Sequence, residues 1–158
     1  MIVLVAGGSK SSEQGAMQSG SFEVVGIPRI LYVDDDPGLA RLVAKVLARD
    51  YDVVTTLSAA DTLRLIANGE RFDAILVDLH LTGMTGEELV RQLDALRPDL
   101  AHRIAFVTGS ADPDANAGLL QGHGSPHLGK PFEIEALRAF VAAILANDPI
   151  VEKRGAGP

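Results

Sequence analysis

The sequence predicts an α/β domain in which helices cover both faces of a parallel sheet. After residue 28, short apolar runs alternate with helical patterns five times, as in a series of β-then-α units. Three of the runs, "ILYV", "AILV" and "IAFV", are apolar throughout. Strands that are buried on both faces have this composition, whereas half-exposed strands alternate with polar residues.

The alternation places each expected element. We expect strands at residues 29–33, 51–56, 73–77, 103–107 and 126–128. Between and after them we expect helices at residues 37–50, 58–69, 87–98, 112–122 and 132–148, of which 112–122 is weak and broken by glycine. Asp36 precedes Pro37 and is a good N-cap, and Ser58 is another. The spacing of apolar residues predicts these inward positions: Leu39, Leu42, Val43, Val46, Leu47, Leu63, Ile66, Leu89, Leu93, Leu96, Ile134, Leu137, Val141 and Ile144.

Length, net charge and cysteine content exclude several classes of protein. A chain of 158 residues suits one domain with a substantial core. A net charge of −7 without a basic cluster argues against direct nucleic-acid binding. The absence of cysteine excludes disulfides and thiolate metal sites. The start, "MIVLVAGG", is too short to span a membrane and lacks a basic flank, so we expect no anchor and a cytoplasmic location.

The domain boundaries follow from changes in composition. Residues 1–28 include a stretch rich in Ser, Gly and Gln, which is typical of a flexible leader or linker. The regular alternation covers residues 29–147, and residues 148–158 read as a C-terminal tail. We therefore expect a single folded domain between two irregular ends.

Polar residues stand where several expected strands end. Asp34 and Asp35 follow the first strand, Asp78 the third, Thr108 the fourth and Lys130 the fifth. The carboxyl ends of parallel strands share one edge of the sheet, where ligands bind in open α/β folds. As a set, these residues indicate a site, although any one aspartate alone would be better explained as a solvated helix cap.

The expected proximity of Asp34, Asp35 and Asp78 has an electrostatic cost. Two unit charges about 4 Å apart repel by roughly 4 kcal/mol at an effective dielectric near 20. Such a cluster raises its pKa values, recruits a lysine or binds a cation. A few carboxylate oxygens completed by water and a phosphate suit Mg²⁺, which is the cofactor that we expect.

The motifs "LYVDDDP", "ILVDLHLTGMTG", "FVTGS" and "GKPF", in this order, make the chain resemble the receiver domain of two-component response regulators. The resemblance covers Arg29 to about Asn147, and some features are similar to receivers of hybrid sensor kinases. It implies a flavodoxin-like (βα)5 fold, doubly wound, with strand order 2-1-3-4-5.

The resemblance also implies a role for each site residue. Asp78 would be the phosphoacceptor, Thr108 the hydroxyl that hydrogen-bonds the phosphoryl group, and Lys130 the cation that pairs with it. The Mg²⁺ ligands would be Asp78, Asp35 directly, Asp34 largely through water, and the backbone carbonyl of His80.

Three positions depart from the commonest pattern of that family. Thr82 replaces a frequent proline and Thr85 a frequent aspartate, from which we expect a more mobile loop and an altered phosphate lifetime. His127 occupies the usual aromatic switch position. A histidine ring can exchange between two rotamers and titrate near neutral pH, so His127 is a candidate switch residue. Substituting it by alanine should disturb signalling and leave phosphorylation intact.

The functional hypothesis is a phosphorelay switch that is not an enzyme on external substrates. The implied partners are a sensor histidine kinase or histidine phosphotransfer protein and a downstream protein target. A homodimer through the face of the fourth helix, fifth strand and fifth helix is a further possibility. Two alternatives stay open: an unphosphorylated pseudo-receiver that serves as a docking module, and an aspartate-nucleophile phosphohydrolase. The second lacks the Thr or Val that it needs, because Gly38 stands at that position.

Overall fold

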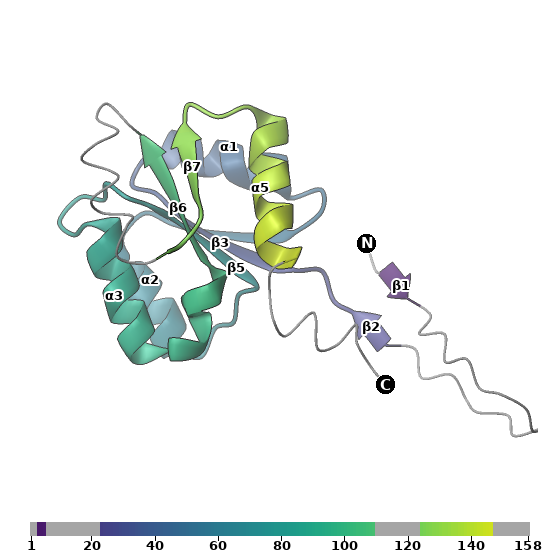
Figure 1. The fold of residues 1–158 in the computed structure, drawn as a ribbon, viewed down its shortest axis with the longest axis horizontal. Coiled ribbons are helices and arrows are strands. Elements are labelled where there is room, and N and C mark those ends of the chain that lie inside the picture. The colour runs from purple at the N-terminus through teal and green to yellow at the C-terminus, as the bar shows by residue number, and fades with distance from the viewer. Residues whose placement is uncertain (1–2, 6–22, 110–123, 147–158) are drawn as a thin grey trace, which may run out of the picture.

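A computed structural model of the chain describes residues 3–5, 23–109 and 124–146 (Figure 1). Its main body is a five-stranded parallel sheet with the order β4-β3-β5-β6-β7. The strands are β3 (Arg29–Val33), β4 (Asp52–Thr56), β5 (Ala74–Asp78), β6 (Ile104–Gly109) and β7 (His127–Lys130). Counted within this sheet, the order is 2-1-3-4-5, which confirms the predicted doubly wound, flavodoxin-like topology.

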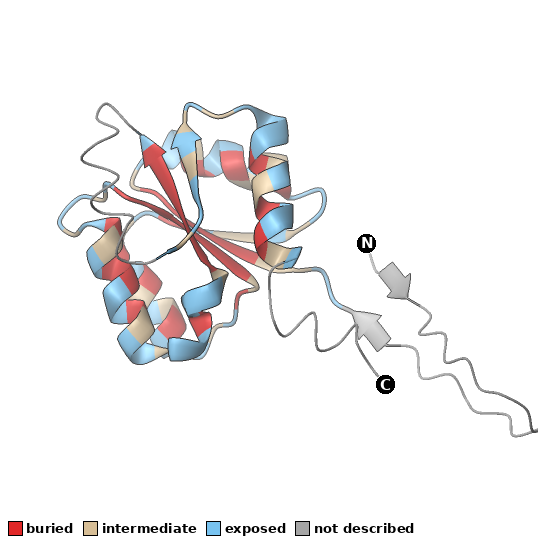
Figure 2. Cartoon of the chain, viewed as in Figure 1, coloured by how far each residue is buried: buried red, intermediate tan, exposed pale blue. Residues whose placement is uncertain are grey.

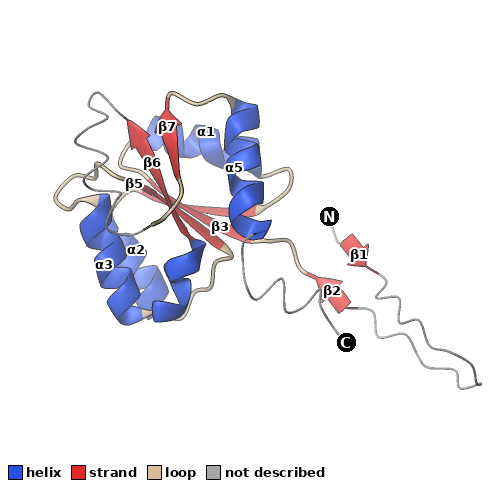
Figure 3. Cartoon of the chain, viewed as in Figure 1, coloured by secondary structure: helices blue, strands red, loops and turns tan. Residues whose placement is uncertain are grey.

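Helices connect most of the strands (Figure 3). They are α1 (Pro37–Leu47), α2 (Ala59–Ala67), α3 (Gly86–Leu96) and α5 (Ile134–Ala146), with a 3-10 helix, η1 (Pro98–Arg103), before β6. The helix expected at residues 112–122 lies outside the described residues. No helix in the described ranges is both long and apolar enough to cross a membrane.

Two apolar layers hold the sheet between the helices. On one face, Leu31 and Val33 of β3 pack with residues of α2 and α3. On the other face, Ile30 and Tyr32 of the same strand pack with residues of α1 and α5. Consecutive strand residues point to opposite faces, so burial on both sides requires a continuous apolar run. Figure 2 shows the central strands buried along most of their length.

The predicted helix caps are present. The Asp36 carboxylate accepts hydrogen bonds from the backbone N–H groups of Gly38 and Leu39, at 2.8 and 3.2 Å. Ser58 accepts one from Asp61 N–H at 3.1 Å. Each cap satisfies donors that the first helical turn leaves unpaired, and the cap at Asp36 thus fixes the start of α1 directly after β3.

Three inward positions were predicted wrongly. Leu42, Leu96 and Ile134 are 51%, 46% and 47% exposed. In α1, Val43 and Leu47 are buried as predicted, and Ala40 is the third buried residue. A helix turns by about 100° per residue, so Leu42 lies well to one side of Val43. Leu96 and Ile134 are the last residue of α3 and the first of α5.

The structure differs from expectation at two further places. β7 begins one residue later than predicted and includes Lys130. β6 includes Thr108 and β5 includes Asp78, so all three residues stand within strands and not after them. Near the N-terminus, β1 (Val3–Val5) pairs antiparallel with β2 (Glu23–Val25), where we expected an irregular leader. These short segments are rich in valine, which favours extended backbone.

Candidate functional site

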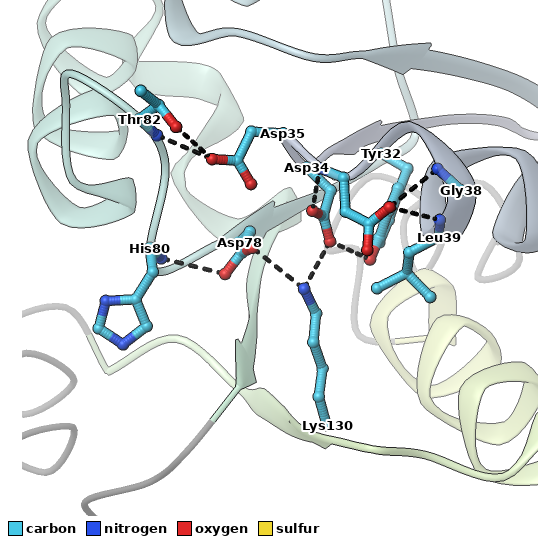
Figure 4. A network of polar contacts seen from close by, with 10 residues as sticks. Tyr32, Asp34, Asp35, Gly38, Leu39, Asp78, His80, Thr82 and Lys130 are labelled. Atoms are coloured by element: carbon cyan, nitrogen blue, oxygen red, sulfur yellow. Dashed lines mark hydrogen bonds and ion pairs between the residues drawn. The ribbon is translucent and has the colours of Figure 1, made fainter.

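The polar residues predicted from the sequence gather at the carboxyl edge of the sheet (Figure 4). Asp34 directly follows β3, while Asp78 and Lys130 are the last residues of β5 and β7. One carboxylate oxygen from each of Asp34, Asp35 and Asp78 lies within 4.8 Å of the other two. Parallel pairing of β3 with β5 brings the first two aspartates beside the third although 44 residues separate Asp34 from Asp78 in the sequence.

Asp34 is the most enclosed of the three carboxylates, with no exposed surface. Its Oδ2 accepts hydrogen bonds from the Tyr32 hydroxyl at 2.8 Å and from Lys130 Nζ at 2.5 Å. Its Oδ1 accepts one from the backbone N–H of Asp36 at 2.9 Å. Burial and the charge of Asp34 raise the pKa of Tyr32 far above its usual value, so the hydroxyl remains a donor. Three donors therefore hold Asp34 in one orientation.

Asp78 is held from two sides. Its Oδ1 accepts a hydrogen bond from the backbone N–H of His80 at 3.0 Å, and its Oδ2 accepts one from Lys130 Nζ at 3.0 Å. Burial raises the pKa of Asp78, and the negative charge of Asp34 adds to that rise; the hydrogen bonds from His80 and Lys130 oppose it without cancelling it. The ionised form of Asp78 is thus under electrostatic strain that an additional cation would relieve.

Lys130 bridges the two buried carboxylates. Burial by itself lowers the pKa of Lys130, but its hydrogen bonds with Asp34 and Asp78 outweigh this effect, and the pKa is raised. The ammonium group is therefore charged at neutral pH. Three carboxylates against one ammonium still leave an excess of negative charge at the site.

Asp35 is bound differently from its neighbours. Its Oδ2 accepts two hydrogen bonds from Thr82 in the loop between β5 and α3, from the hydroxyl at 2.6 Å and from the backbone N–H at 3.1 Å. Among the described residues, no hydrogen bond reaches the other carboxylate oxygen, Oδ1. Figure 4 shows Asp35 and Thr82 facing each other across the two loops.

The other predicted residues lie around this cluster. Thr108 is buried in β6, one position beyond Val107, which pairs with Asp78. His80 is exposed, and its side chain points away from Asp78 (Figure 4). His127 is exposed at the start of β7. The structure thus brings Thr108 to the same edge and leaves His127 at the opposite end of its strand from Lys130.

The donor set fits a hard divalent cation. All three converging groups are carboxylates, without nitrogen or sulfur ligands, and Mg²⁺ prefers oxygen. Hydrogen bonds occupy both oxygens of Asp34 and both oxygens of Asp78, whereas Asp35 accepts hydrogen bonds on Oδ2 alone, so Asp35 offers the most accessible oxygen of the three.

The sequence interpretation missed three residues that shape this site. Tyr32 was taken only as part of an apolar strand, and Thr82 only as a replacement for proline. Gly86, the first residue of α3, lies so close to the end of β5 that a Cβ there would approach the backbone oxygen of Asp78 to 2.3 Å. The hydroxyl of Tyr32, two residues before Asp34, was a detectable signal because strand residues two apart share a face.

Comparison with known proteins adds independent information. Residues 30–142 match the family model described as the response regulator receiver domain. The chain is 35% identical over 127 residues to the transcriptional regulatory protein GlrR of Escherichia coli, covering 79% of this chain and 28% of GlrR. It is 30% identical to hybrid signal transduction histidine kinase D of Dictyostelium discoideum, covering 75% of this chain and 8% of the kinase. The chain thus spans a minor part of these relatives.

Solved structures agree with the sequence matches. A CheY-like response regulator receiver domain protein from Methanospirillum hungatei aligns with a TM-score of 0.70 and 28% identity, covering 80% of this chain and 99% of that one. The receiver domain of a putative LuxO repressor protein from Vibrio parahaemolyticus aligns with a TM-score of 0.69 and 26% identity, covering 83% and 98% of the two chains.

Proposed function

The chain belongs to the response regulator receiver family, and we propose that it is a phosphorelay switch whose phosphoacceptor is Asp78. The observation that carries this proposal is the meeting of Asp34, Asp35, Asp78 and Lys130 at the carboxyl edge of the sheet. The donor would be a phosphohistidine on a sensor kinase or phosphotransfer protein.

The proposed reaction is a phosphoryl transfer to a carboxylate. An oxygen of Asp78 forms a bond to phosphorus as the bond between phosphorus and the donor imidazole nitrogen breaks, and the imidazole keeps the electron pair. Lys130 Nζ, which contacts Asp78 Oδ2 at 3.0 Å, is placed to offset the charge of the phosphoryl oxygens. Asp78 becomes an aspartyl phosphate, a recognised covalent form of this side chain.

A bound Mg²⁺ would supply positive charge that offsets the carboxylates and the incoming phosphoryl oxygens. Asp35 and Asp78 would hold it directly, Asp34 largely through water, and the His80 carbonyl would complete the protein ligands. Asp34 also has a structural role, because its two oxygens accept hydrogen bonds from Lys130 and from the backbone N–H of Asp36. Thr108 would donate its hydroxyl to the phosphoryl group after transfer.

The output of the switch would be a change in protein contacts. Phosphorylation can shift the population from the inactive to the active conformation. The size of this shift is limited by the difference between the interaction free energies of the phosphoryl group with the two conformations. We propose that the responding surface is formed by the helix expected at residues 112–122 together with β7 and α5, and that a homodimer forms through the same face, with His127 as the candidate switch residue. This chain is proposed not to bind nucleic acid itself. A cytoplasmic location stays a prediction.

A single experiment tests the phosphoacceptor. The protein is incubated with acetyl phosphate and Mg²⁺, and its intact mass is measured. We expect one phosphoryl adduct in the native protein and none in Asp78→Asn or after EDTA. Folded native protein that never acquires the adduct would support the pseudo-receiver alternative. Repeated turnover of a small phosphoester would support the phosphohydrolase.

A further inference from the structure

The loop that follows β5 contacts the acidic cluster in a way that the proposed function does not use. Thr82 donates both its hydroxyl and its backbone N–H to Asp35 Oδ2, at 2.6 and 3.1 Å, although 47 residues separate the two in sequence. A hydroxyl and an amide on one oxygen fix both the position and the rotation of the carboxylate. A proline, frequent at this position in the family that the chain resembles, could donate neither bond.

Asp35 needs such an anchor more than its neighbours do. Asp34 is enclosed and held by three donors, and Asp78 by two. Asp35 is only partly buried, and among the described residues Thr82 is its sole side-chain hydrogen-bond partner. Repulsion from Asp34 and Asp78 would otherwise turn the Asp35 carboxylate toward solvent. The contact with Thr82 therefore keeps Asp35 within the cluster.

The contact leaves one oxygen of Asp35 available. Thr82 takes Oδ2, and no hydrogen bond from the described part of the chain reaches Oδ1. We propose that Thr82 is a positioning residue for the magnesium site: it orients Asp35 so that Oδ1 faces the cation while Oδ2 stays bound to the loop. This inference rests on the proposed function, because it assumes that the cluster binds Mg²⁺.

Residues that orient a metal ligand typically change metal affinity by about 10- to 100-fold when they are removed. The test is Thr82→Val, which keeps the shape and the backbone donor and deletes the hydroxyl. Amide chemical shifts of labelled protein are followed during titration with MgCl₂. We expect the Kd for Mg²⁺ to rise about 10-fold, and Thr82→Ser to restore an affinity close to that of the native protein.

A second measurement separates positioning from general damage to the loop. The rate of phosphorylation by acetyl phosphate is measured across Mg²⁺ concentrations. In Thr82→Val the half-saturating Mg²⁺ concentration should rise, while the rate at saturation stays near the native value. Thr85→Val is the matched control, because the Thr85 hydroxyl lies in the same loop and caps α3 by accepting from Glu88 N–H. It should lower the melting temperature in EDTA and leave Mg²⁺ affinity unchanged.

The outcomes distinguish this inference from the proposed function. If native protein binds no Mg²⁺ and forms no adduct, both are wrong. If native protein does both and Thr82→Val binds Mg²⁺ equally well or more tightly, only the positioning role of Thr82 is wrong. Equal losses in Thr82→Val and Thr85→Val would also overturn it, since loop stability would then explain the effect.

Discussion

At the scale of single residues, the site holds more negative than positive charge, because three carboxylates face one ammonium group. Lys130 bonds Asp34 and Asp78, and Tyr32 adds a neutral donor to Asp34. These contacts hold two carboxylates in a buried place, yet the pKa of Asp78 remains raised because burial outweighs them. The proposed phosphoacceptor, Asp78, therefore lowers the stability of the folded protein when it is ionised.

This cost gives a prediction for Asp78→Asn. The folded pKa of Asp78 lies above its unfolded value, so the folded state binds more protons and loses stability as pH rises through that window. The asparagine cannot ionise, and its single amide oxygen can still accept from Lys130, but its NH2 group cannot accept the hydrogen bond from the His80 N–H. In EDTA at pH 7 the variant should melt at a higher temperature than the native protein, by the part of the electrostatic cost that exceeds the lost hydrogen bond.

The pH dependence is the control. Below the ordinary aspartate pKa of about 4, Asp78 is protonated in both states, and the gain from asparagine should vanish. Thermal melts of the two proteins between pH 3.5 and 7.5 check this, provided that both refold. A gain of the same size at every pH would contradict the electrostatic explanation.

At the scale of elements, the start of α3 lies in close contact with the end of β5. The backbone N–H of Gly86 donates to Leu79 O at 2.9 Å, and the absent side chain lets α3 begin directly against the end of β5. A Cβ at this position would meet the Asp78 oxygen at 2.3 Å and Leu79 Cα at 2.9 Å. Both are backbone atoms, so relief requires that the helix or the strand move.

We therefore expect Gly86→Ala to destabilise the domain by about 1–3 kcal/mol, as other insertions into packed regions do. It should also slow phosphorylation of Asp78, because the strand end that carries Asp78 must shift. Urea denaturation and the rate of adduct formation measure the two effects. Gly129→Ala is the control: a Cβ there meets nothing within 4 Å, and both quantities should stay near their native values.

At the scale of the whole molecule, one sheet joins two apolar layers. Leu93 of α3 belongs to the layer on one face, and Leu137 of α5 to the layer on the other. Both are at most 1% exposed. The strands that carry the site separate the layers and share residues with both, so we expect the layers to unfold together and not as separate units.

Leu93→Ala and Leu137→Ala should each lower the free energy of unfolding by about 2–5 kcal/mol. In each variant, circular dichroism and the fluorescence of the tyrosines should report one coincident transition in urea. Leu96→Ala, at a position 46% exposed, should change stability by less than about 0.5 kcal/mol. Two separate transitions in either core variant would show that the layers are independent.

The fold class could be predicted from the amino-acid sequence, because burial on both faces imposes apolar runs such as "ILYV", and helix caps such as Asp36 act on atoms two or three residues away. The sequence also indicated which polar residues would share an edge, since strand ends in a parallel sheet must meet. Leu42, Leu96 and Ile134 were predicted wrongly because the period of apolar residues indicates which side of a helix is apolar. It does not indicate how much of that side the sheet covers.

The contacts within the site could not be predicted before the three-dimensional arrangement was known. That Thr82 donates to Asp35, that Lys130 joins Asp34 to Asp78, and that Gly86 must lack a side chain all depend on atoms brought together from distant segments. The spacing of residues along the sequence does not determine the distances between atoms of distant segments. They are set by how the twisted sheet and its helices pack, and packing depends on all elements at once.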